Sequence, residues 1–440
     1  MRYKKLLSFV TFFIGLLYSP LAYAFIQDTE IDDALRKMCA PIFKAAGLNQ
    51  NAVEFRIINS PTLNAFVQNG QTIYLHTGLI TQTENIGQLI GVLAHETGHI
   101  QGGHVIGLKQ AYNDSAWHSV LGMAVGIAAA AASGEAKAGV AAAAIGQDLA
   151  RRSLMQHSRT HENAADQAGV RLMEQAGYSP QGLLDAMVLL NEKALYRVND
   201  PYLLTHPLTD ERIQNLKNFV ERSSLKSKPY SLDFHEKYNR IRAKTIGFLY
   251  GYDAIKRAYP HHDKDFASKY AWAIMYFRQG RLEGALNIVD GLLVQKPNDG
   301  YLHELKGQIL FENGHVARSI DSYEKALDLL PHASLVKLSY AHALTELKNI
   351  VSYQKAKKIL KKIAISQKQN PQYWRLLSIV HAKTNEMGLA YLALAEKALL
   401  ERDLKTAEAQ AKRAQGMFPE YSKQWVQSQD ILRFVKQQKK

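Results

Sequence analysis

The feature that most constrains the fold is a repeat in the C-terminal part of the chain. A shift of the sequence by 34 residues aligns small residues and prolines, Ala273 with Gly307, Gly280 with Gly314, Ala285 with Ser319 and Pro297 with Pro331, and it aligns the large residues Tyr276 and Leu310. A further copy carries Ala395, Ala407, Ala414 and Pro419, and an intermediate copy ends at Pro371 after an insertion near Lys348. Small residues let paired helices approach closely, and a proline stops the second helix of each pair.

This period is typical of tetratricopeptide repeats, whose stacked helix pairs form a superhelix with a concave groove for proteins or peptides. Unrelated amphipathic helices would not keep a fixed period. We therefore expect an all-α repeat domain over residues 263–440, preceded by linker helices over residues 232–262.

Residues 25–231 have a mixed pattern and form a separate predicted domain. After a helical opening, IDDALRKMCAPIFKAAGL, the segment VEFRIINSPTLNAFVQNGQTIYLHTGLI alternates like short strands. Asn59-Ser60-Pro61 interrupts these strands, and Asn69-Gly70 is a hairpin signal. The pattern predicts a small antiparallel sheet in a mostly helical α+β domain.

A helix is predicted directly after this sheet. Thr81 followed by Glu84 has the spacing of a capping box at a helix start. Apolar residues then recur at helical spacing, at Ile86, Leu89, Ile90 and Leu93. The second half of this helix contains the sequence HETGH, residues 95–99.

HETGH carries the chemistry of a metal site. Residues four apart project from one face of a helix, so His95 and His99 can share a zinc ion. Glu96 stands beside the first histidine and can act as a general base toward a water molecule. Because Cys39 is the only cysteine, a multi-thiolate site is excluded and the ligands must be nitrogen and oxygen atoms.

A catalytic zinc needs a third protein ligand, and three candidates exist. The local pattern HExxHxxGxxH would require a histidine at position 105, but the chain has Val105 there and its histidine at His104. One residue of difference turns the side chain away on a helix. We therefore expect His104 to support a ligand or to lie at the surface.

The second candidate is Glu162, within SRTHENAADQAG. Glu162 and Asp166 stand at i and i+4 on a predicted helix, and Ala164 and Ala165 are small enough to let that helix lie close to the first. Glu162 would bind the metal while Asp166 accepts a hydrogen bond from a ligand imidazole.

The third candidate is His206, in PYLLTHPLTDERI. Pro207 favours an extended backbone at His206, as in a loop. From there it could donate a hydrogen bond to a reaction intermediate, occupy the open metal position, or point to water. Arg212 could orient a carbonyl or carboxylate group, or pair with Asp210.

Two apolar segments are too short to span a membrane. The first 24 residues have a basic start, an apolar run and Ala22-Tyr23-Ala24, which is the layout of a secretory signal cleaved after Ala24. An uncleaved anchor is the alternative. Residues 121–147 are rich in alanine and predict a close-packed helical hairpin; contact with lipid or an exposed substrate segment is the alternative.

The formal net charge is +14, and much of it lies in the C-terminal half. No compact basic motif is interleaved with aromatic residues, which argues against a nucleic-acid partner. A solvated basic surface is the simplest interpretation. Weak attraction to an anionic membrane surface or to acidic partners is the alternative.

Taken together, HETGH, the set Ser158, Arg159, Glu162, Ala165 and Asp166, and THP followed by Arg212 resemble a known family. They are similar to the zinc metallopeptidases related to the CAAX prenyl protease and HtpX. With an export signal and C-terminal repeats, the whole chain resembles most closely the periplasmic β-barrel assembly-enhancing proteases. Gly98 is a mild departure, since glycine costs about 0.8–1.0 kcal/mol in a helix interior. Its spacing from Gly91 predicts close packing of another element.

The resemblance implies a zincin-like fold with one Zn2+ on His95, His99 and Glu162, and with Glu96 as the base. It implies that His206 plugs the metal from an inhibitory loop, and it makes Arg212 and Asn64 candidates for orienting substrate. It also implies a periplasmic endopeptidase that degrades misassembled outer-membrane proteins and aids their assembly, with the repeats docking on the β-barrel assembly machinery. A chaperone or scaffold with a latent metal site is the competing hypothesis.

Overall fold

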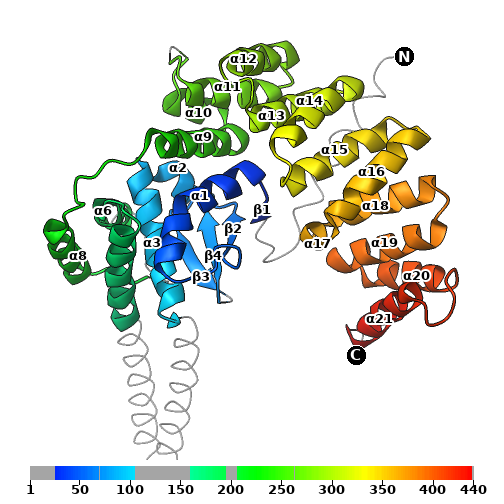
Figure 1. Cartoon of the computed structure of the whole chain (residues 1–440), viewed down its shortest axis with the longest axis horizontal. Coiled ribbons are helices and arrows are strands. Elements are labelled where there is room, and N and C mark those ends of the chain that lie inside the picture. The colour runs from blue at the N-terminus through cyan, green and yellow to red at the C-terminus, as the bar shows by residue number, and fades with distance from the viewer. Residues whose placement is uncertain (1–24, 69, 105–158, 195–205, 262, 439–440) are drawn as a thin grey trace, which may run out of the picture. The chain divides into compact units, whose positions relative to one another are not determined.

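Figure 1 shows a computed structural model of the chain, which describes residues 25–68, 70–104, 159–194, 206–261 and 263–438. The predicted signal segment 1–24 and the alanine-rich segment 121–147 lie outside the described residues. The chain divides into two compact units. The first comprises Met1–Gln27 and Asp32–Tyr238, and the second comprises Asp28–Ile31 and Asn239–Lys440. Within the described part, none of the helices has the length and apolar character needed to cross a membrane.

The first unit contains a four-stranded sheet with the order β1-β2-β4-β3. Its strands are β1 (Phe25–Ile26), β2 (Glu54–Ile58), β3 (Ala65–Gln68) and β4 (Thr72–His76). The predicted hairpin is confirmed, since β3 and β4 are antiparallel and Gly70 between them has φ +85°. The expectation of a purely antiparallel sheet is wrong: β4 lies between β3 and β2 and runs parallel to β2, so the sheet is mixed.

Two helices follow the sheet, α2 (Thr77–Gln82) and α3 (Ile86–Gln101), and α3 carries HETGH. The predicted capping box at Thr81 is wrong, because Thr81 lies inside α2. Asn85 caps α3 instead: its side-chain oxygen accepts a hydrogen bond from Gln88 N at 3.0 Å. The side-chain oxygen of Gln88 accepts from the backbone N of Glu84, one residue before the cap, at 2.7 Å.

Two other helices pack closely on α3 at its glycines. A Cβ atom added to Gly98 would lie 2.8 Å from Ala165 O, on a helix over residues 159–175. One added to Gly91 would lie 2.5 Å from Leu183, on α6 (Gln181–Ala194). The close packing predicted from Gly91 and Gly98 is therefore confirmed. Ala165 makes this approach, whereas Ala164 is exposed. The first unit also contains α8 (Asp210–Arg222) and most of α1 (Thr29–Ala45).

The second unit is helical throughout its described residues. α9 (Leu232–Leu249) enters it and α10 (Tyr252–Ala258) follows. The repeat helices are then α11 (Phe266–Arg278), α12 (Leu282–Gln295), α13 (Gly300–Glu312), α14 (Val316–Leu329), α15 (Ser334–Glu346), α16 (Ile350–Lys362), α17 (Ala364–Gln367), α18 (Pro371–Lys383), α19 (Met387–Leu400), α20 (Leu404–Gln415) and α21 (Lys423–Gln438). They stack in chain order in Figure 1.

The 34-residue period is visible in the backbone. Gly280, Gly314 and Lys348, each 34 residues after the last, all have positive φ, at 70°, 84° and 55°. Lys348 therefore keeps the period. The next equivalent turn is at Asn385, φ 60°, which is 37 residues later, so the insertion lies between α16 and α18, where α17 stands. The predicted fold class, a mostly helical domain with a small sheet followed by all-helical repeats, is confirmed.

Candidate metal centre

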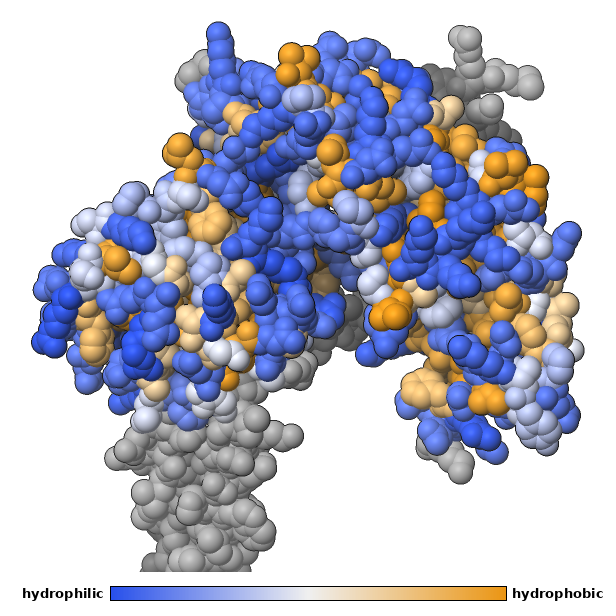
Figure 2. Space-filling view, viewed as in Figure 1, coloured by the Kyte–Doolittle hydropathy of each residue, from blue (hydrophilic) through white to orange (hydrophobic). Residues whose placement is uncertain are grey.

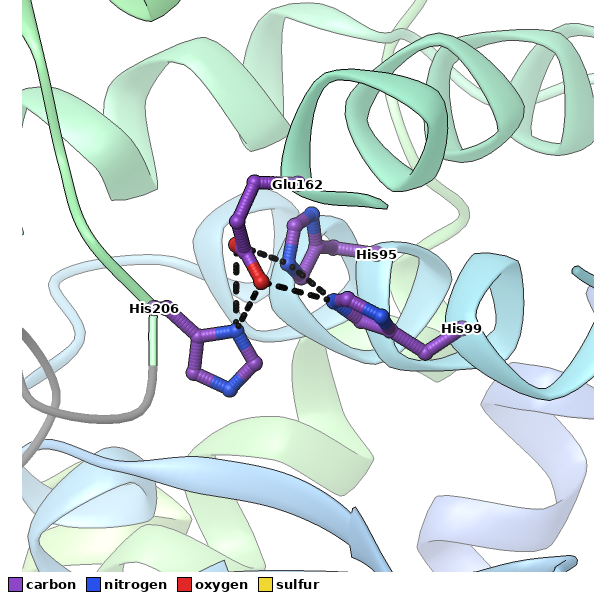
Figure 3. Close-up of side chains that lie close together, drawn as sticks. All are labelled: His95, His99, Glu162 and His206. Atoms are coloured by element: carbon purple, nitrogen blue, oxygen red, sulfur yellow. Dashed lines mark hydrogen bonds and ion pairs between the residues drawn. The ribbon is translucent and has the colours of Figure 1, made fainter. Parts of the chain in front are cut away.

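Two histidines from α3 form the base of the candidate site. His95 and His99 stand one turn apart, both are buried, and their Nε2 atoms are 3.1 Å apart. Figure 3 shows both imidazoles pointing toward the carboxylate of Glu162. A four-residue step on a helix brings the two rings to one face, as the sequence predicts.

Glu162 approaches from the neighbouring helix, residues 159–175. Its Oε2 lies 3.4 Å from His95 Nε2 and its Oε1 lies 3.3 Å from His99 Nε2. Ligands about 2.0–2.1 Å from a tetrahedral zinc ion stand roughly 3.3–3.4 Å from one another. The spacings among these donor atoms therefore fit that ion, and all three side chains are buried, so few competing water molecules reach them.

The imidazole of His95 is held from its other side. His95 Nδ1 lies 2.8 Å from Asp166 Oδ1, the contact predicted for Asp166. Arg212, which lies on α8, donates to both oxygens of Asp166, from Nε at 2.8 Å and from Nη2 at 2.9 Å. Its Nη1 is also 3.0 Å from Glu162 Oε2. Arg212 thus contacts the carboxylates of both Asp166 and Glu162.

These contacts keep the carboxylates ionised. Burial alone raises the pKa of Glu162, but the nearby His206, His95 and His99 lower it well below its usual value. The pKa of Asp166 is likewise lowered, because hydrogen bonds from His95 and Arg212 outweigh the effect of burial. Burial lowers the pKa of His95, yet bonds to Asp166 and Glu162 raise it overall, to about 10. Ionised carboxylates that lie beside imidazoles in this way are groups that can bind a cation.

His206 closes the cluster from the loop before α8. Its Nδ1 lies 3.1 and 3.2 Å from the two oxygens of Glu162, and its Nε2 lies 3.2 Å from Ala65 O on β3. One ligand atom from each of His95, His99, Glu162 and His206 fits within a span of 4.8 Å. Figure 3 shows His206 beside the Glu162 carboxylate, and its ring centroid lies 5.3 Å from those of both His95 and His99.

Glu96 lies at the same place but makes few contacts. It is fully buried, and neither of its carboxylate oxygens accepts a hydrogen bond from the described residues. The Nε2 atom of His206 lies 3.5 Å from Glu96 Oε1. A buried carboxylate that accepts no hydrogen bond is costly unless a ligand uses it. Glu96 is therefore available to a water molecule or substrate.

Two further residues that the sequence singles out are His104 and Asn64. His104 Nδ1 lies 3.0 Å from His99 Nδ1, so His104 faces a predicted ligand rather than solvent. Asn64 precedes Ala65; its backbone oxygen accepts from His76 N at 3.0 Å, and its buried side-chain oxygen has no hydrogen-bond partner among the described residues. The sequence carried a signal for His104 in Gly102 and Gly103, which allow a tight turn at the helix end.

Comparisons with known proteins agree with this geometry. Residues 27–220 match peptidase family M48, and residues 291–406 match the cytochrome c-type biogenesis protein H TPR domain. The chain is 25% identical to the β-barrel assembly-enhancing protease of Yersinia pestis, over 80% of this chain and 72% of that protein. It is 25% identical to the protein of that name from Escherichia coli K12, over 84% and 76%. It is 26% identical to the E. coli metalloprotease YcaL, over 42% and 69%.

Proposed function

We propose that the chain is a zinc-dependent endopeptidase with a protein-binding repeat unit, because residues 27–220 match peptidase family M48 and residues 291–406 match a TPR domain. The proposed ligands are His95, His99 and Glu162. We further propose the division into residues 25–231, the linker helices 232–262 and the repeats 263–440.

The observation that carries the proposal is the charge balance of the buried cluster. Glu96, Glu162 and Asp166 carry three negative charges when ionised, and Arg212 supplies one positive charge; all four are buried. A divalent cation held by two imidazoles and a carboxylate supplies the other two positive charges. Nitrogen and oxygen ligands in a buried tetrahedral arrangement are the donor set that zinc prefers.

When bound, zinc supplies a Lewis acid that polarises the scissile carbonyl group and promotes ionisation of the attacking water. The side chains do the rest. Glu96 accepts the proton of the water and passes it to the leaving amine. Asp166 keeps the His95 ring oriented through Nδ1, and Arg212 keeps both Asp166 and Glu162 in place.

His206 is proposed to gate the site. It contacts Glu162, Glu96 and the backbone oxygen of Ala65, and β3 is the edge strand to which an extended substrate can add. A substrate must therefore displace His206 from the carboxylate and from the strand. Replacing His206 with Ala should raise the rate of peptide cleavage; a fall in rate would instead support a direct role in the reaction.

The repeat unit is proposed to bind other proteins. A cavity of about 620 Å³ between α12, α13 and α14 is lined by apolar and charged residues that include Leu293, Val294, Lys306 and Leu329. Figure 2 shows separate hydrophobic patches among hydrophilic residues on the visible face of the repeat helices. By its similarity to the β-barrel assembly-enhancing proteases, we propose a periplasmic enzyme that acts on misassembled outer-membrane β-barrel proteins, with the repeats docking on the assembly machinery.

The decisive experiment replaces Glu96 with Gln and measures zinc content and cleavage of a denatured β-barrel protein. The variant should keep its zinc, and its cleavage rate should fall by a factor of at least about 100, because only proton transfer is removed. Glu221→Gln, an exposed residue of α8, is the matched control and should keep full activity. Undiminished cleavage by the Glu96 variant would refute the proposal.

A chaperone or scaffold role is the second candidate, favoured by a repeat unit that is a compact body of its own. The same Glu96→Gln variant separates the two functions in cells that lack the protein. If the variant restores outer-membrane assembly as well as the unmodified protein does, binding is the main activity. If it fails while remaining folded, hydrolysis is required.

A further inference from the structure

The second ring nitrogen of His99 has a specific neighbour. His99 Nε2 faces the candidate metal ligands, and its Nδ1 lies 3.0 Å from Nδ1 of His104, with the two rings inclined at 82°. An imidazole that binds a metal through Nε2 carries its proton on Nδ1, so His99 is then the donor of this bond. His104 must accept through a deprotonated Nδ1.

The end of α3 is built to bring His104 to this position. The helix ends at Gln101, and Gly103 has φ +62°, a left-handed conformation that reverses the chain. The spacing rule for a continuous helix therefore does not apply to His104, which is why its one-residue displacement from the local ligand pattern does not turn it away from His99.

Gly102 leaves the space that the His104 ring occupies. A Cβ atom added at Gly102 would lie 2.2 Å from Nε2, 2.7 Å from Cδ2 and 2.8 Å from Cε1 of His104. The backbone of Gly102, φ −78° and ψ −5°, is one that any residue can adopt. Space for the ring, rather than backbone conformation, is therefore what requires glycine here.

A third histidine stacks on the same ring. The His161 ring stacks on His104 with centroids 4.3 Å apart and planes inclined by only 9°. His161 directly precedes Glu162 on the helix over residues 159–175. The His104 ring is thus fixed between the end of α3 and the helix that supplies the proposed third ligand.

We propose that His104 is a positioning residue that accepts the Nδ1 proton of His99 and so fixes the tautomer and ring orientation with which His99 binds the metal. Residues that hold a ligand imidazole in this way typically contribute 10–100-fold to metal affinity. The proposal rests on the proposed metal site. The Gly102-Gly103-His104 turn then serves to place the His104 ring beside His99, a role that the pattern HExxHxxGxxH does not assign to it.

The test compares three variants of the full chain by zinc titration against a competing chelator. His104→Phe keeps a flat ring but removes the acceptor and should weaken zinc binding by about 10–100-fold. His104→Asn offers an amide oxygen as acceptor and should recover part of this loss. Gly102→Ala leaves His104 in the sequence but displaces its ring, and should weaken zinc binding as His104→Phe does.

Gly416→Ala is the matched control. Gly416 also caps a helix, α20, with φ −67° and ψ −8°, but an added Cβ would approach nothing closer than 3.8 Å. This variant should bind zinc normally. The absorption spectrum of the cobalt(II)-substituted protein provides a second readout, which should change in His104→Phe and Gly102→Ala and stay unchanged in Gly416→Ala.

Two results would overturn the proposal. One is unchanged zinc affinity and cobalt spectrum in both His104→Phe and Gly102→Ala. The other is a loss of stability in the metal-free His104→Phe and Gly102→Ala proteins, measured by urea unfolding, that equals their loss of zinc-binding free energy. His104 would then have a purely structural role. If the unmodified protein itself binds no zinc, the proposed function fails, and that outcome is distinct from either of these.

Discussion

Arg212 lies outside the proposed ligand set and contacts two carboxylates of the candidate metal centre. Its guanidinium is 2% exposed and lies against both Asp166 and Glu162. Planar, two-pronged contacts of this kind are a property of arginine that lysine does not share. Without it, two carboxylates would stay buried with less positive charge beside them. Arg212 is therefore expected to matter for stability and for metal affinity.

We predict that Arg212→Met lowers the free energy of unfolding by about 3–5 kcal/mol, because removing one partner leaves buried charges uncompensated. Zinc affinity should also fall by 10–100-fold. Arg212→Lys should restore little of either, because it loses the two-pronged geometry. Urea unfolding and zinc titration measure both effects. Arg222→Met, an exposed residue of the same helix, should change neither, and equal values for the two Met variants would contradict the prediction.

The sequence predicts which residues gather at the candidate metal centre better than it predicts their neighbours. His95, Glu96 and His99 follow from spacing on one helix, and Glu162 with Asp166 follows from the same rule on another. The contacts of Arg212 do not follow, because nearby Asp210 is a partner of equal chemistry and only the tertiary arrangement selects Asp166 and Glu162. His104 lies beyond the end of α3, so helical spacing does not determine which way its ring faces.

The contact between α3 and the helix over residues 159–175 sets the distance between the proposed ligands on the two helices. Gly98, one residue before His99, meets the backbone of Ala165, which lies one residue before Asp166. A side chain at Gly98 would move the two helices apart at the level of the ligands. The cost of glycine in the helix interior, about 0.8–1.0 kcal/mol, is thus offset by the close approach that it permits.

We predict opposite outcomes for the same substitution in two helices. Gly98→Ala puts a Cβ 2.8 Å from Ala165 O and should lower both zinc affinity and stability. Gly291→Ala, in α12, meets nothing within 4 Å and should stabilise the chain by about 0.5–1 kcal/mol. Thermal unfolding with and without zinc measures both. A Gly98→Ala variant that is as stable and binds zinc as tightly as the unmodified protein would show that this contact does not position Glu162.

Element order and type were predictable, whereas strand neighbours and helix starts were not. The hairpin of β3 and β4 is a local event that its turn residues predict. The parallel pairing of β2 with β4 cannot be predicted from a local turn, because β2 could join the hairpin beside either β3 or β4. The start of α3 was misplaced because Thr81 and Asn85 are both good capping residues, and α2 extends through the first of them.

The second unit depends on a segment from the other end of the sequence. Glu30, in the first turn of α1, bonds to Arg240, to Lys244 at 3.0 Å and to the hydroxyl of Tyr270 at 2.8 Å. Burial alone would raise the pKa of Glu30, but Arg240 and Lys244 lower it to about 2. Glu30 is 3% exposed, so solvent screens these ion pairs little.

The lowered pKa predicts a pH dependence with a definite sign. The contribution of Glu30 to the free energy of unfolding is complete above pH 4.5 and is lost as pH falls toward about 2. A difference of this size corresponds to about 3 kcal/mol. Glu30→Gln should therefore destabilise the second unit by about this amount at pH 7 and progressively less as the pH falls.

Tryptophan fluorescence during urea unfolding can follow this effect, since Trp272, Trp374 and Trp425 lie in the second unit. A Trp117→Phe background removes the remaining tryptophan. Glu283→Gln, at an exposed position of α12, is the control and should leave the pH profile unchanged. A Glu30→Gln profile parallel to that of the unmodified protein would contradict the assignment of Glu30.

This arrangement fixes an order of events during synthesis. Glu30 is 210 residues ahead of Arg240 and 240 residues ahead of Tyr270 in the chain. At about 5–20 residues per second, a ribosome takes roughly 10–40 s to make the intervening stretch. Throughout that time the segment Asp28–Ile31 has none of its final neighbours from Asn239 onward, and the first unit's sequence is completed first. A fragment beginning at Asn239 would lack Glu30 altogether, so expressing the repeats alone removes one of their own buried charges.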